Sequence, residues 1–190
     1  MTGSRLIAFA IGVLLGLAPS QALARDFKIG GDVTISLGEG WSGTIRQNPA
    51  MQFAGMKDLM EDATEARLRT EGTGVLVSYM KFKTKKAPTE VAVDDAAMTA
   101  QSAKQVYGAQ AVETDIVATV HQDGDVVRSF VTLHPKSGAR FNVAPGYPEG
   151  CITSGTIRRG AAIHSISIAS ESCESAAHLE AVAAIFGPGQ

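Results

Sequence analysis

The sequence predicts an α+β fold, in which an antiparallel β-sheet is flanked by helices and a C-terminal helix packs on the sheet. Strand-like segments follow one another in the second half of the chain, and helical spacing appears in the middle and at the end. No repeat or low-complexity linker divides the sequence. Strands segregated from helices in this way favour an α+β layer architecture over a doubly wound parallel sheet.

Residues 1–24 have the pattern of a secretory signal peptide. Arg5 precedes an apolar run from Leu6 to Ala18, and the segment ends with the small residues Ala22 and Ala24. The apolar run is shorter than the about 20 residues that a membrane span needs, and no later segment competes with it. We expect cleavage after Ala24, a periplasmic or secreted location, and no membrane span.

Residues 25–190 are expected to form a single α+β domain. They number 166 and carry 16 basic and 19 acidic side chains, since Arg5 is the only charged residue of the leader. This length suits one hydrophobic core. Mild acidity argues against nonspecific binding to nucleic acid, which requires a strongly basic surface.

The first predicted strand places Val33, Ile35 and Leu37 on one face and reaches a Gly-rich turn, with Trp41 just beyond. The next segment is predicted to be a helix from Met56 to Arg69. Its apolar residues fall at helical spacing, although the stretch EARLRTE could equally form a strand.

Residues 73–86 predict a second strand, with Val75, Val77 and Tyr79 on one face. A helix should follow from Asp94 or Asp95 and end near Gly108, because its body is rich in alanine.

Closely spaced strands come next, in residues 111–135, 139–145, 151–159 and 161–170. Asp123-Gly124 is the hairpin signal within the first of these ranges. The closing helix is expected to be capped by Ser170 or Ser172, with Glu174 in its first turn, and to stop at Gly187.

This order of elements resembles the PsbP and Mog family of folds, which includes exported bacterial PsbP-like proteins. The resemblance lies in the corner Gly38-x-Gly40-Trp41, in a middle helix that leads into antiparallel strands, and in the strand IHSISIAS that runs into the last helix. It covers most of residues 25–190 without a specific motif. It implies a non-catalytic accessory or binding protein and supplies no catalytic residues.

Cys151 and Cys173 are the two cysteines of a chain predicted to be exported, where thiols are usually oxidised. We predict one structural disulfide between them. A redox-active pair is not indicated because the sequence has no Cys-x-x-Cys motif. A zinc site is not indicated either, because no second ligand stands at the usual spacing from either cysteine.

Three of the six methionines, Met51, Met56 and Met60, fall within a short stretch. Met56 and Met60 have the i, i+4 spacing of a buried helical stripe, and methionine commonly fills cores. The alternative is a copper site, because thioethers are soft ligands. Packing is the preferred interpretation, and no metal or cofactor is predicted.

The histidines are expected to be exposed or locally bonded. They are scattered, at His121, His134, His164 and His178, and the last should form a surface pair with Glu174 one turn away. No Gly-x-Ser-x-Gly elbow, His-Glu-x-x-His helix or phosphate-binding glycine loop occurs. The sequence therefore gives no residue on which an enzyme mechanism would rest.

Three features are candidates for binding a protein or small-molecule partner. Four lysines at the end of the second predicted strand could bind an acidic protein or lipid headgroups, but protection of a sheet edge is the preferred interpretation. The loop from Phe141 to Cys151 carries Tyr147 and is either a binding surface or a stiff connection. Two arginines precede Gly160 at a predicted turn. The candidate residues are Lys81, Lys83, Lys85, Lys86, Tyr147, Arg158 and Arg159.

The leading prediction is an exported accessory or binding protein without catalysis. The first alternative is a periplasmic metal (copper) binding protein that uses Met51, Met56 and Met60 or the histidines, and the third hypothesis is an enzyme.

Overall fold

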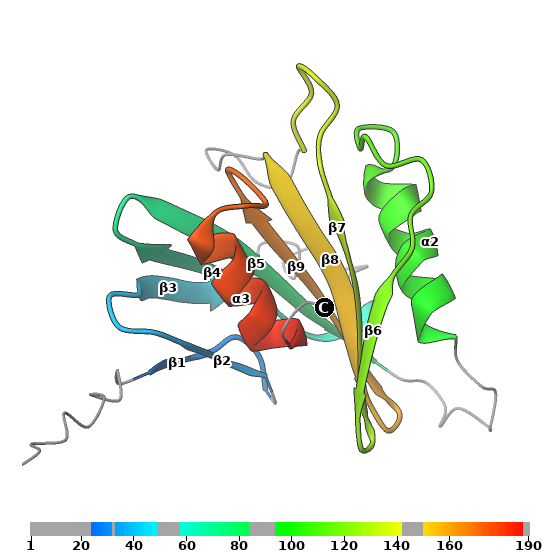
Figure 1. The fold of residues 1–190 in the computed structure, drawn as a ribbon. Helices are drawn as coiled ribbons and strands as arrows, with labels where there is room; N and C mark the ends of the chain where they lie inside the picture. Colours follow the sequence, from blue (N-terminus) through cyan, green and yellow to red (C-terminus); the bar gives the residue numbers. More distant parts are fainter. Residues whose placement is uncertain (1–23, 32, 49–57, 84–93, 142–149, 188–190) are drawn as a thin grey trace, which may run out of the picture.

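The structure, a computed structural model, describes residues 24–31, 33–48, 58–83, 94–141 and 150–187. It has the predicted α+β class, with a seven-stranded antiparallel sheet in the order β3-β4-β5-β9-β8-β7-β6 and a separate two-stranded sheet (Figure 1). The strands of the main sheet are β3 (Ser42–Gln47), β4 (Met60–Thr70), β5 (Thr73–Phe82), β6 (Thr119–Asp123), β7 (Val126–Leu133), β8 (Cys151–Arg159) and β9 (Ala162–Ser170). The other elements are β1 (Arg25–Lys28), β2 (Thr34–Leu37), α2 (Asp95–Tyr107) and α3 (Ala176–Phe186).

One face of the sheet packs against α3 and the β1–β2 hairpin, which bury the larger core cluster. Alternation along β5 directs Val75, Val77 and Tyr79 to this face, as the sequence predicts. Phe186 of α3 stacks on Phe130 of β7 with ring centroids 5.0 Å apart.

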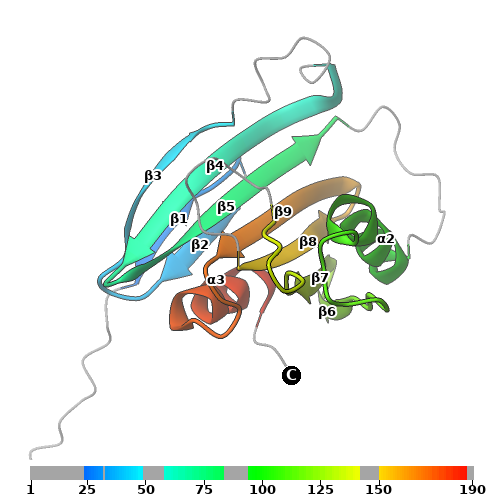
Figure 2. The same ribbon diagram turned by 90° about the horizontal axis from the view of Figure 1, so that it is seen from above.

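The opposite face packs against α2, which crosses β7 and β8 and encloses a second apolar cluster (Figure 2). Asp94 caps this helix by accepting a hydrogen bond from the backbone N–H of Ala97. The predicted middle helix is therefore confirmed, including its boundary at Gly108. Within the described ranges, neither helix has the length and hydropathy that crossing a membrane requires.

The predicted helix from Met56 to Arg69 is wrong where the structure describes it. Apart from a short turn at residues 58 and 59, the segment forms strand β4, which pairs with β3 on one side and β5 on the other. Buried Ala66 and Leu68 alternate with Arg67, a period of two. Pairing with β5 along the segment, and with β3 over residues 64–69, outweighs the local helical spacing, because it gives the backbone groups hydrogen-bond partners.

Lysine protection of a sheet edge is also wrong, because β5 is an interior strand between β4 and β9. The outermost strands of the main sheet are β3 and β6. The hairpins β6–β7 and β8–β9 form as predicted. Residues 139–141, however, lie outside any strand, and residues 142–145 of that predicted strand lie outside the described residues.

Helix α3 begins later than predicted. Ser175 is its N-cap and accepts a hydrogen bond from the backbone N–H of His178, whereas Ser170 ends β9 and Ser172 lies in the connection. Glu174 consequently precedes the helix instead of occupying its first turn. Gly187 follows the last helical residue with φ 94°, as the predicted glycine stop requires.

Candidate functional site

A pocket of about 100 Å³ lies on the α3 face, between β2, the C-terminal half of α3 and strands β7, β8 and β9. Four of its lining residues are apolar, and the other four are two arginines, a histidine and a threonine. Val33 and Thr34 come from the β1–β2 hairpin and its approach, Ala184 and Ile185 from α3, and Arg128, Ile157, Arg159 and His164 from the sheet. We call this the β2–α3 pocket.

Strand register explains why these side chains meet. Residues directly opposite one another across the sheet form one row on the α3 face, in the order His121, Arg128, Ile157, His164, Lys81 and Asp62. Arg159 lies two residues beyond Ile157 on the same face of β8, diagonal to Arg128. We call these six residues the polar row, although it contains Ile157. The row crosses β8 at Ile157, away from Cys151 and the disulfide.

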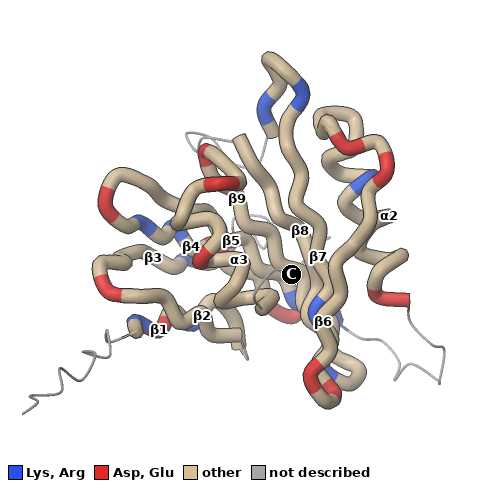
Figure 3. Tube along the Cα trace, viewed as in Figure 1, with Lys and Arg blue, Asp and Glu red and all other residues tan. Residues whose placement is uncertain are grey.

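The side chains of Arg128 and Arg159 make no hydrogen bond or ion pair with another residue in the described part of the chain. Arg128 is half-buried and Arg159 is exposed. Asp123, the carboxylate nearest to Arg159 in strand register, is separated from it by Val126. Figure 3 shows acidic positions at the tip of the β6–β7 hairpin and basic positions further up these strands. Two guanidinium groups thus line a pocket to which the described residues contribute no counter-charge.

His164 forms the buried end of the pocket, with 3% of its surface exposed. Its Nδ1 lies 3.0 Å from the hydroxyl oxygen of Tyr79, which is fully buried. Gly30 packs directly on the Tyr79 ring, because a Cβ at residue 30 would lie 2.3 Å from ring carbon Cε1. The hairpin therefore encloses the Tyr79–His164 pair and fixes the imidazole at the base of the pocket.

This arrangement suits a small oxyanion. A guanidinium group presents a planar fork of N–H donors that matches the oxygens of a carboxylate or phosphate. The apolar walls formed by Val33, Ile157 and Ile185 lower the local dielectric constant and strengthen such contacts.

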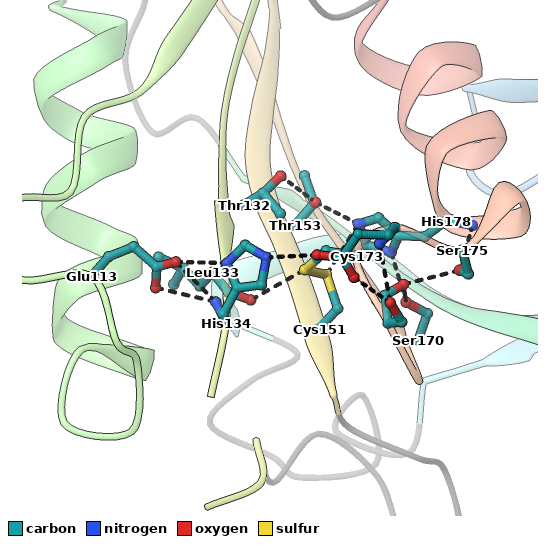
Figure 4. Close-up of a disulfide and its surroundings, with 12 residues drawn as sticks. Glu113, Thr132, Leu133, His134, Cys151, Thr153, Ser170, Cys173, Ser175 and His178 are labelled. Carbon is teal, nitrogen blue, oxygen red and sulfur yellow. Dashed lines mark hydrogen bonds and ion pairs between the residues drawn. A yellow bond between two sulfur atoms is a disulfide. The ribbon is translucent and has the colours of Figure 1, made fainter. Parts of the chain in front are cut away.

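The disulfide Cys151–Cys173 is present as predicted and joins the start of β8 to the segment before α3 (Figure 4). The predicted surface pair of His178 and Glu174 is wrong, because His178 is buried with 1% of its surface exposed. Its Nδ1 lies 2.8 Å from Oγ of Ser170, and its Nε2 lies 2.8 Å from Oγ1 of Thr153. The later start of α3 turns His178 toward the sheet.

Ser170 and His178 form a hydroxyl–imidazole pair that resembles a nucleophile and its base. Both residues are buried, and the Ser170 hydroxyl donates to the carbonyl oxygen of Ser172 at 2.9 Å. The pair is therefore inaccessible to a substrate and ties the start of α3 to β9.

His134 lies on the other side of the disulfide, between two carboxylates (Figure 4). Its Nδ1 is 2.7 Å from Glu113, and its Nε2 is 3.5 Å from Glu174. Burial alone would raise the pKa of Glu113, but hydrogen bonds from the ring and backbone N–H of His134 help to bring that pKa below its ordinary value. The contact joins the segment after α2 to the segment before α3.

The two arginines predicted together as a turn have different roles. Gly160, with φ 55°, makes the turn between β8 and β9 as predicted. Arg158 points to the α2 face, where its Nη2 lies 2.7 Å from Oδ2 of Asp95. Only Arg159 lines the β2–α3 pocket.

The other predicted site residues do not gather into one site within the described ranges. Lys81 lies in the polar row, with its Nζ donating to Glu61 at 2.9 Å, and Lys83 is exposed just after β5. Met60 is buried on β4 with 1% exposed, as core packing requires, although not on a helix. Lys85, Lys86, Tyr147, Met51 and Met56 lie outside the described residues.

Sequence reasoning missed Arg128 and the convergence of His164 with Arg159. The hairpin signal at residues 123 and 124 fixes the register of β6 and β7, so it carries part of this information. The missing part was the pairing of β7 with β8, because the 17 residues of sequence between Leu133 and Cys151 do not specify it.

Comparison of the chain with protein-family models, with curated proteins and with solved structures found no match.

Proposed function

We propose that the protein is an exported, non-catalytic binding protein that holds a small oxyanion in the β2–α3 pocket. The pair Arg128 and Arg159 carries this proposal, because both guanidinium groups line one pocket without an ion-pair partner among the described residues. Holding two like charges together costs electrostatic energy, and an anion between them would relieve that cost.

The roles within the pocket follow from position. Arg128 and Arg159 would donate hydrogen bonds to the anion, while Val33, Ile157 and Ile185 would exclude water around it. The buried His164 would close the base of the pocket, held there by Tyr79. Binding alone is proposed, because the exposed Thr34 supplies the only hydroxyl or thiol group among the described residues that line the pocket.

Export is the second part of the proposal. It rests on the leader pattern of residues 1–24, and the Cys151–Cys173 disulfide is consistent with an oxidising compartment. The resemblance to PsbP-like proteins implies an accessory or binding role, and a binding pocket would fit that expectation.

Isothermal titration of the purified protein with inorganic phosphate and with acetate tests the binding. We expect one site per chain, and we expect affinity to fall about 10-fold or more for Arg128→Gln or Arg159→Gln, since a charge-assisted hydrogen bond contributes about 1.5–3 kcal/mol. Arg69→Gln is the matched control, because Arg69 is an exposed arginine on β4 that does not line this pocket.

Asp32 lies next to Val33 in the sequence and outside the described residues. Asp32→Asn therefore belongs in the series, because tighter binding in this variant would identify Asp32 as a competitor for the arginines. The proposal fails if neither anion binds to wild type or to Asp32→Asn. It also fails if Arg128→Gln and Arg159→Gln bind as tightly as Arg69→Gln.

A further inference from the structure

Three potential metal ligands meet at the N-terminal end of α3, in a place separate from the β2–α3 pocket. The sulfur atoms of Cys151 and Cys173 and a ring nitrogen of His178 all lie within 4.8 Å of one another. All three residues are buried, with 0%, 7% and 1% of their surfaces exposed. Nε2 of His178 is 3.4 Å from Sγ of Cys151.

The hydrogen bonds around His178 fix which nitrogen carries the proton. The Ser170 hydroxyl donates its hydrogen to the carbonyl oxygen of Ser172, so its oxygen accepts from Nδ1–H of His178 at 2.8 Å. In the neutral ring with its proton on Nδ1, Nε2 carries a lone pair. That lone pair faces Oγ1 of Thr153 and Sγ of Cys151.

This is the tautomer that binds a metal through Nε2. Metal-binding histidines typically donate their other ring N–H to a neighbouring oxygen, which fixes the orientation of the ring. Ser170 supplies that oxygen here, and its own hydrogen bond to Ser172 fixes it in turn. The hydrogen bonds that orient His178 are thus those expected around a metal-binding histidine, although His178 is also a buried core residue.

We propose that reduction of the Cys151–Cys173 disulfide creates a binding site for a thiophilic divalent cation of the Zn²⁺ type, with Cys151, Cys173 and Nε2 of His178 as ligands. A dithiol reductant supplies two electrons and two protons, which convert the disulfide to two thiols while the reductant becomes a disulfide. Binding of the cation then releases both thiol protons.

Geometry and charge both support this ligand set. Tetrahedral zinc has bonds of about 2.3 Å to sulfur and about 2.0–2.1 Å to nitrogen, which place the sulfur and nitrogen ligands about 3.6 Å apart. The distance of 3.4 Å between Sγ of Cys151 and Nε2 is already close to this value. Two thiolates and a neutral imidazole balance the charge of a divalent ion, which matters in a buried place.

The site requires the sulfur atoms to separate and the hydroxyl of Thr153 to release Nε2, from which it lies 2.8 Å. Cys151 is the first residue of β8 and is held by the sheet, whereas Cys173 lies in the connection between β9 and α3. We therefore expect Cys173 to move. Oxidised protein lacks the thiolates and has no site, so the disulfide acts as a redox control on metal binding.

Competition between the protein and a chromogenic zinc chelator tests the proposal under anaerobic conditions. The oxidised protein should bind no Zn²⁺ at this site, and the protein reduced by a removable immobilised dithiol should bind one Zn²⁺ per chain. His178→Gln should weaken binding about 10-fold or more, and Ser170→Ala, a change at a positioning residue, about 10–100-fold. His134→Gln is the matched control, because His134 contacts Glu113 and Glu174 and is not one of the three ligands.

Cobalt supplies a readout that does not depend on the variants folding. Co²⁺ added to the reduced wild-type protein should give a thiolate-to-cobalt charge-transfer band and the visible bands of tetrahedral coordination. Three results would each overturn the proposal. The first is reduced wild-type protein that binds no Zn²⁺, whether folded or unfolded, and the second is His178→Gln that folds and binds Zn²⁺ as tightly as His134→Gln. The third is equal binding by the oxidised protein.

Discussion

Nε1 of Trp41 donates a hydrogen bond to Oε2 of Glu180 at 3.0 Å, which joins the corner after β2 to α3 across 139 residues of sequence. The other oxygen of the same carboxylate accepts from the backbone N–H of Gly38 at 2.7 Å. One side chain of α3 thus holds both ends of the Gly-x-Gly-Trp corner. The corner and the helix together close the α3 face of the sheet over the core.

Glu180→Ala should destabilise the fold by about 1–3 kcal/mol, because the indole N–H of Trp41, a residue with only 3% of its surface exposed, loses its acceptor. Chemical denaturation followed by tryptophan fluorescence measures this, since Trp41 is the only tryptophan. Glu171→Ala, at an exposed carboxylate before α3, is the control. Equal denaturation midpoints for the two variants would contradict the role of Glu180.

Local sequence patterns predicted those elements whose own residues determine them. The helix beginning after Asp94 has a capping carboxylate and an alanine-rich body, and strands β8 and β9 are joined at Gly160. The disulfide followed from the presence of two cysteines in a chain predicted to be exported. Each of these signals lies within a short stretch of sequence or depends on composition alone.

The sequence predictions were wrong or incomplete where strand pairing between distant segments determines the structure. Segment 60–70 has helical spacing at its start, yet β5 pairs with it from Met60 to Thr70 and β3 pairs with residues 64–69. The interior position of Lys81 was missed, because one of its neighbours in the sheet comes from β9, some 80 residues later in the sequence. The β2–α3 pocket likewise needs Arg128, Arg159 and His164 in register, which no single segment specifies.

Removing the disulfide with Cys151→Ala and Cys173→Ala should cost about 3 kcal/mol of unfolding free energy, because the bond closes a loop with a sequence separation of 22. The measurement is urea denaturation with and without dithiothreitol. Wild-type protein should lose stability in the reductant, and the double variant should be indifferent to it. A wild-type midpoint that does not respond to reduction would show that the cysteines do not form this bond in solution.

His178 should make stability depend on pH between about 4 and 6.5. Burial is the largest cause that lowers the pKa of His178 from 6.5 to about 4, and it outweighs the attraction of Glu174. The unfolded chain therefore binds a proton in this window that the folded protein does not. Stability is greatest above pH 6.5 and falls by up to about 3 kcal/mol as the pH approaches 4.

His178→Gln isolates this contribution, because the other titrating groups, including His134 and Glu113, are common to both proteins. The difference in unfolding free energy between wild type and variant should shrink as the pH falls from 6.5 to 4. A constant difference across this window would mean that His178 is not held neutral in the folded protein.

Arg158→Lys should destabilise the protein by about 1–2 kcal/mol, although it keeps the charge. Nε and Nη2 of Arg158 both donate to the carboxylate of Asp95, which joins β8 to the first turn of α2, and lysine cannot form this paired contact. Arg159→Lys, on the other face of the same strand, should change stability by less than about 0.5 kcal/mol. Denaturation midpoints that rank the two variants in the opposite order would refute this assignment.

Gly155→Ala should be the most disruptive of these single changes. A Cβ at residue 155 would lie 2.4 Å from the backbone oxygen of Ser129 and 2.8 Å from Cε1 of Phe186. One contact is with the neighbouring strand β7 and the other with α3, so relief requires the helix to move away from the sheet. We expect a loss of about 3 kcal/mol or more of unfolding free energy, together with a weaker near-ultraviolet circular dichroism signal, because Phe186 stacks on Phe130.

Gly31→Ala is the matched control, since an added Cβ there meets no atom within 4 Å. If both alanine variants melt at the wild-type temperature, α3 does not pack on β8 as closely as described. In that case α3 would not form a wall of the β2–α3 pocket either.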